Sequence, residues 1–277
     1  MMSTNYRIIL TSLPVELLYE IQLFSLSESL PCVNKRSHEI FKLATSAFRA
    51  QFLIACFENV TNKRSRARGV MTKALRYPLC TIEVMETMFK SPLCPPLDAT
   101  PELPRRLFKA LSSKGQSEWS YRDAPLPFLR HLYNCDRIRP PNPNSHDGYA
   151  LTMAVYADFI PLIRFLLDNG ASPACHNRLA VKVAIRKKDL GITRMLIESE
   201  WYDNNGRRGR DYTRPQQDDR IQVTPGLLKI AVQAGAIDIG LYFMEKGVAP
   251  DIDTLRLNLP NIIAKRPTGV AQGTQKR

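Results

Sequence analysis

The sequence predicts an all-α fold, and two patterns lead to that prediction. One is a stripe of apolar residues at steps of four, four and three, the spacing of an amphipathic helix: Leu13, Leu17, Ile21 and Phe24. The other is a set of three segments between residues 150 and 250 that align without gaps over their helical parts. We therefore expect a small helical unit followed by a helical repeat array.

The helical unit is expected to contain three helices. Thr11 or Ser12 can cap the first helix, and Pro14 fits its first turn, where a missing N–H costs nothing. A second short helix is expected from Ser27. The third has one apolar side, formed by Ile40, Phe41, Ala44, Phe48, Phe52 and Cys56. Three helices in about fifty residues make a core that is marginal without a partner or a neighbouring domain.

The motif Leu-Pro-x-Glu-Leu-Leu-x-x-Ile, followed by a spaced Leu, by Val-x-Lys and by an aromatic residue, resembles an F-box. The matching positions are Leu13, Pro14, Glu16, Leu17, Leu18, Ile21, Leu30, Val33, Lys35 and Phe41. The sequence departs from the family pattern at Asn34, where a cysteine is usual, and no tryptophan follows Lys35. The resemblance implies that all these positions except Phe41 contact the Skp-type adaptor of a cullin-RING ubiquitin ligase. The alternative is a helical cap that packs entirely on the following domain.

The repeat segments share one register, counted from the alanines Ala154, Ala184 and Ala231. Apolar residues recur six, eight and twelve positions later, the last being Leu166, Leu196 and Phe243. Gly170 and Gly247 stand sixteen positions on in the first and third copies and suit the left-handed end of a helix. A single copy cannot cover its apolar face, so the copies are expected to stack.

The endings LLDNGASP and MEKGVAP resemble ankyrin repeats, although the Thr-Pro-Leu-His turn of that family is absent. Two fainter copies are possible upstream, and an irregular helical bundle is the alternative. The resemblance implies a protein-binding surface on the first helices and turns, for which the candidates are Tyr149, Thr152, Lys182 and Arg186. Together the two resemblances imply a non-catalytic substrate-recognition subunit of an SCF-type ubiquitin ligase. A repeat scaffold with no ligase role is the second candidate.

The net charge of +13 supports a third candidate, a nucleic-acid or chromatin binder. No aromatic platform interleaves with the basic clusters, which argues against single-strand binding. No catalytic, phosphate-binding or dinucleotide motif is present, and we expect no cofactor. The six cysteines contain no CxxC pair, so a metal site is not expected; most are flanked by apolar residues, which predicts buried thiols.

No signal-peptide core or membrane-spanning run is seen, which predicts a cytoplasmic or nuclear protein. The expected organisation is a flexible N-terminus (1–10), the F-box-like unit (11–57), a basic linker (58–69), the ankyrin-like array (70–253, with an insertion at 201–222) and a disordered tail (254–277).

Overall fold

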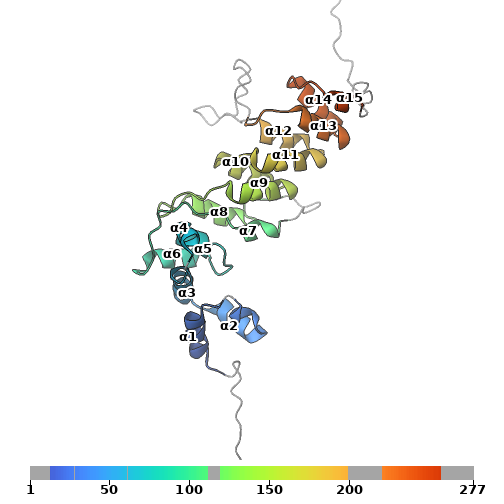
Figure 1. Cartoon of the computed structure of the whole chain (residues 1–277). Helices are drawn as coiled ribbons and strands as arrows, with labels where there is room; N and C mark the ends of the chain where they lie inside the picture. The colour runs from blue at the N-terminus through green and yellow to red at the C-terminus, as the bar shows by residue number, and fades with distance from the viewer. Residues whose placement is uncertain (1–12, 28, 61, 112–118, 199–219, 257–277) are drawn as a thin grey trace, which may run out of the picture. The chain divides into compact units, whose positions relative to one another are not determined.

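A computed structural model gives the fold of the chain, and the residues it describes are 13–27, 29–60, 62–111, 119–198 and 220–256 (Figure 1). Every regular element in these ranges is a helix, which confirms the all-α prediction for them. The predicted N-terminal stretch 1–10 and most of the predicted insertion lie outside the described residues. The chain forms two compact units: unit 1 comprises Met1–Ala110 and Tyr121–Ser145, and unit 2 comprises Leu111–Ser120 and His146–Arg277.

Unit 1 is organised around one buried helix. Its helices are α1 (Val15–Ser25), the 3₁₀ turn η2 (Leu30–Cys32), α2 (Lys35–Leu43), α3 (Ser46–Glu58), α4 (Lys63–Ala67), α5 (Gly69–Ala74), α6 (Ile82–Lys90), α7 (Arg106–Lys109) and α8 (Leu126–Tyr133). Helix α3 packs against α1, α5 and α6. It buries residues on several sides, among them Phe52, Leu53 and Phe57, because neighbours cover it almost all round. The N-terminal helices therefore share a core with residues beyond the expected boundary at 57.

Three expectations for this region were wrong. The predicted third helix is broken into α2 and α3, which meet at a bend of 104°. Ala44 has an extended backbone (ψ 148°), and the hydroxyl of Thr45 caps α3 by accepting a hydrogen bond from the Phe48 N–H at 3.2 Å. The predicted helix from Ser27 is only the short turn η2. Pro14 is the N-cap residue of α1 rather than part of its first turn, and it makes no side-chain cap.

Unit 2 consists of helix pairs with the same turn between the two helices of each pair. The pairs are α9 (Ser145–Tyr156) with α10 (Ile160–Asp168), α11 (Cys175–Arg186) with α12 (Leu190–Ile197), and α13 (Pro225–Gln233) with α14 (Ile237–Glu245). In each pair the predicted anchor alanine is fully buried and its carbonyl accepts an N–H five residues on, at 2.9–3.2 Å. The residue four positions after the alanine is left-handed each time: Asp158, Lys188 and Gly235 have φ of 56°, 59° and 64°.

The pairs stack on one another, as the repeat pattern predicts. Helix α10 contacts α12, α12 contacts α14, and α11 contacts α13. Gly170 and Gly247 have φ of 85° and 84°, the left-handed conformation predicted for them. A short helix α15 (Ile252–Arg256) packs on α13, so residues 254–256 are ordered rather than part of the predicted disordered tail.

The prediction that most of the cysteine thiols are buried is wrong, because only two of the six are buried. Cys56 and Cys80 are buried, whereas Cys32 is exposed and Cys94, Cys135 and Cys175 are intermediate. Burial raises the pKa of the Cys80 thiol to about 12, against a smaller opposing effect of the nearby Arg106 guanidinium.

We expect iodoacetamide to label Cys32 rapidly and Cys80 hardly at all in the folded protein at pH near 8.5. Cys32 is exposed to the reagent, whereas Cys80 is buried and its thiol, with a pKa near 12, keeps its proton at that pH; the thiolate is the reactive form. Peptide mass spectrometry after timed labelling measures both rates, and labelling in urea is the control in which they become similar. Equal rates in the folded protein would contradict the burial of Cys80.

Candidate functional site

Helix α1 is held in unit 1 by one of its faces. Leu18 and Gln22 point inward, with 1% and 2% of their surface exposed. The Tyr19 hydroxyl donates to the carbonyl of Ile40 at 3.3 Å, and its ring lies 4.4 Å from that of Phe48, centre to centre. These contacts fix the rotation of α1 about its axis, and thus which side chains face outward.

The buried Gln22 also fixes the end of the helix. Its side-chain amide donates to the carbonyl of Ser27 at 2.8 Å. Leu26 takes the left-handed conformation (φ 47°), and its N–H donates to the Gln22 carbonyl at 3.0 Å. The chain therefore turns away sharply after Ser25 and leaves the last turn of α1 uncovered by the residues that follow it directly.

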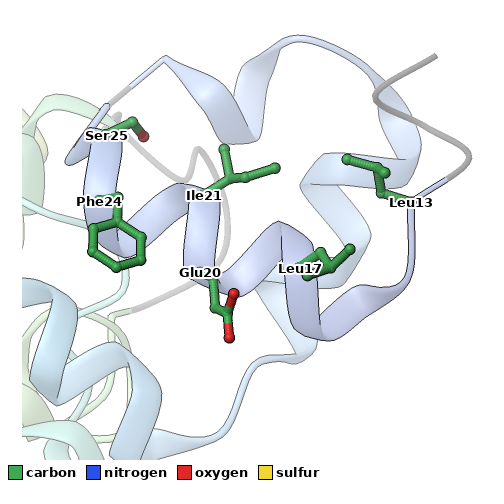
Figure 2. A pocket seen from close by; sticks show the side chains of 6 residues that line it. All are labelled: Leu13, Leu17, Glu20, Ile21, Phe24 and Ser25. Atoms are coloured by element: carbon green, nitrogen blue, oxygen red, sulfur yellow. The ribbon is translucent and has the colours of Figure 1, made fainter. Parts of the chain in front are cut away.

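The outward side of α1 borders an open hollow of about 500 Å³ (Figure 2). It is lined by Leu13, Leu17, Glu20, Ile21, Phe24 and Ser25, which we call the α1 face. Leu17 is 43% exposed and Phe24 is 88% exposed. The four apolar members are the stripe found in the sequence, so the stripe lines a solvent-open surface rather than the core. Contiguous apolar side chains in such a position are typical of a binding surface.

The residues predicted to contact an adaptor lie in different environments. Those exposed are Pro14, Glu16, Leu17, Val33 and Lys35, and those half-buried are Leu13, Ile21 and Leu30. Leu18 is buried in the core of unit 1, so it supports α1 from behind and has no surface for a partner. The hollow brings together Leu13, Leu17 and Ile21 from the predicted set.

Sequence reasoning did not assign Phe24, Glu20 and Ser25 to the site, although all three line the hollow. Phe24 could have been found, because it continues the stripe three residues after Ile21. Leu43, at the end of α2, is 80% exposed and was not singled out either. Leu43 does not belong to the predicted apolar side of this region, so the periodic pattern did not point to it.

The predicted target-binding residues all belong to unit 2. Tyr149, Thr152 and Lys182 are half-buried, and Arg186 is exposed. The Thr152 hydroxyl donates to the carbonyl of Gly148 at 3.2 Å, which ties it to its own helix. Thr152 and Lys182 occupy the same register position on α9 and α11, two residues before the anchor alanine of each.

Among the described residues, no three His, Cys, Asp or Glu side chains are grouped as metal ligands. Burial raises the pKa of Tyr133 as it does that of Cys80, and neither residue lines the hollow. Among the described helices none can cross a membrane alone; α2 and α3 have the length and composition only when joined across their bend.

Comparison with known proteins gives no further constraint: no family model, curated protein or solved structure matches this chain.

Proposed function

We propose that this chain is a substrate-recognition subunit of an SCF-type cullin-RING ubiquitin ligase. In this proposal the N-terminal segment is an F-box that binds a Skp-type adaptor, and the stacked helix pairs of unit 2 are diverged ankyrin repeats that bind the target protein. The observation that carries the proposal is the open α1 face, on which Leu13 and Leu17 of the F-box-like motif remain accessible.

The exposure of Leu17 and Phe24 favours a partner over a cap. Complete burial of a leucine or phenylalanine side chain contributes about 1.5–3 kcal/mol, and a cap would gain this energy by packing the stripe on its own chain. Instead, Leu18 provides the internal contact and the neighbouring Leu17 stays 43% exposed. An adaptor that covered the hollow would bury both Leu17 and Phe24, and a few such residues commonly dominate the affinity of an interface.

Unit 2 supports the second half of the proposal through its geometry. Each helix pair repeats the buried alanine, the left-handed turn residue and the hydrogen bond that closes the turn. Stacked repeats of this kind commonly present an extended binding surface. A repeat scaffold with no ligase role would share unit 2 but would make no use of the α1 face.

Binding of purified Skp-type adaptor to the purified wild-type chain tests the proposal. Isothermal titration calorimetry is expected to give a dissociation constant in the micromolar range or below, and size-exclusion chromatography should show co-elution with adaptor and cullin together. A folded, monodisperse chain that binds no adaptor at high micromolar concentration would remove the ligase proposal. Capture of a target by the same sample would then favour the scaffold.

A further inference from the structure

We propose that unit 2 binds an extended acidic peptide segment on a basic surface formed by Lys182, Arg186, Lys187 and Lys188. The role of this surface as the target-binding site rests on the proposed function. Its binding of a peptide can be tested without the adaptor. The four residues lie on α11 and on the left-handed turn that follows it. Buried Val181, Ala184 and Ile185 alternate with them on the opposite side of the helix.

Three of the four cations have no partner for their charged groups among the described residues. Among the described residues, neither an ion pair nor a side-chain hydrogen bond is made by Lys182, Arg186 or Lys188. Lys187 is the exception: it pairs with Asp158 and donates to the carbonyl of Tyr156 at 2.8 Å. Asp189, the nearest acidic residue in sequence, is occupied as the cap of α12, where it accepts the Ile192 N–H at 2.8 Å. Among the described residues of unit 2, the charges of Lys182, Arg186 and Lys188 are therefore not neutralised by an ion pair.

The surface continues onto the neighbouring repeats. The Nζ of Lys188 is placed 3.7 Å from the position that a Cβ on Gly235 would take, so it reaches the turn between α13 and α14. Lys229 on α13 stands at the register position of Lys182. On the other side, Tyr156 is 55% exposed, and its ring lies 5.9 Å from Lys187 Nζ. Cations in the middle with an exposed aromatic ring beside them fit a peptide that has both acidic and apolar side chains.

The spacing of the cations favours an extended ligand. Lys182 and Arg186 are four residues apart on a helix, which places their Cα atoms about 6 Å apart along the axis. Alternate side chains of an extended peptide point to the same side and are about 6.6 Å apart. Acidic residues at alternate positions would thus meet the two cations in register. A nucleic-acid duplex is the less favoured ligand, because typical duplex contacts engage about six to ten phosphates.

Fluorescence anisotropy with the full chain tests this inference. The probe is a labelled short peptide of alternating glutamate and threonine, and its matched control has glutamine in place of glutamate. We expect the glutamate peptide to bind and the glutamine peptide to bind at least tenfold more weakly. The double reversal Lys182→Glu/Arg186→Glu should weaken binding of the glutamate peptide by about tenfold or more.

The matched control is Lys109→Glu/Arg139→Glu, which makes the same change of charge at two exposed positions of unit 1. It should change peptide binding by no more than about twofold. If the reversal variant fails to fold, as judged by circular dichroism, Lys182→Gln/Arg186→Gln replaces it and should give a smaller loss in the same direction. The reversal variant should still bind the adaptor, and a chain with a defective α1 face should still bind the peptide.

Equal binding of the glutamate and glutamine peptides would overturn the inference, as would a folded reversal variant that binds like wild type. A short DNA duplex serves as the third probe. Tighter binding of the duplex than of the peptide, lost in the reversal variant and falling steeply with salt, would assign the basic surface to nucleic acid instead.

Discussion

Replacing Leu17 with aspartate is expected to weaken adaptor binding by about a hundredfold or more, with the fold unchanged. Leu17 is 43% exposed and lines the hollow, so its side chain contributes little to the core of unit 1. A partner that covers the α1 face would have to bury the new carboxylate, which costs several kcal/mol without a compensating charge. Calorimetry with purified adaptor measures the loss, and circular dichroism checks helix content.

Phe24→Asp is the second variant for the same prediction, because Phe24 is 88% exposed and has even less contact with the core. Ile21→Asp should also abolish binding, but Ile21 is half-buried and its replacement can disturb the unit itself. The matched control is Leu93→Asp, at a leucine of unit 1 that is 65% exposed and does not line the hollow. Loss of binding in the control, or full binding by both α1 variants, would exclude the α1 face as the adaptor site.

Gly148→Ala is expected to lower the unfolding free energy of unit 2 by about 3 kcal/mol. Gly148 has φ of 73°, a conformation that costs a residue with a Cβ roughly 1–2 kcal/mol. An added Cβ would also lie 2.7 Å from the Cβ of Cys175, which starts the next helix pair. A Cβ is fixed to the backbone and cannot move aside as the end of a long side chain can. Overpacking of this kind costs about 1–3 kcal/mol.

Gly170→Ala separates the two causes, because Gly170 has φ of 85° and an added Cβ would meet nothing within 4 Å. It should cost only the conformational part, about 1 kcal/mol. Urea unfolding can be followed through Trp119, which stacks on Phe159 at 4.4 Å within unit 2, after Trp201→Phe has removed the other tryptophan. Equal losses in the two alanine variants would show that the helix pairs do not approach as closely as described.

The repeat architecture of unit 2 could be predicted because its signals are local. Ala154, Ala184 and Ala231 are small residues at positions where helices approach closely, and the glycines end helices in a conformation that few other residues adopt. The break between α2 and α3 could not be predicted in the same way. The apolar stripe continues across Ala44 and Phe48, so periodicity favours one helix. The chain forms two helices instead, because the Thr45 hydroxyl caps the start of α3.

For the candidate site, too, periodicity in the sequence does not determine which side chains are exposed. The sequence places Leu17 and Leu18 side by side in one motif, and periodicity alone does not decide which of them faces the core. The contacts of Tyr19 with Ile40 and Phe48 decide it, and these connect residues far apart in the chain. Likewise, the spacing of Lys182 and Arg186 on a helix is visible in the sequence. Only the folded structure shows that neither side chain has a carboxylate partner among the described residues.

The left-handed residue between the two helices of each pair has a consequence for how such an array changes its length. The turn between the two helices, which we call the joint, has the same left-handed residue whether it is aspartate, lysine or glycine: Asp158, Lys188 and Gly235. Because the joint tolerates different side chains and each pair contacts mainly its neighbours, an in-frame duplication or deletion of one whole pair leaves every remaining joint intact. Such a chain can gain or lose helix pairs by recombination of its gene, one pair at a time, while the other pairs keep their structure.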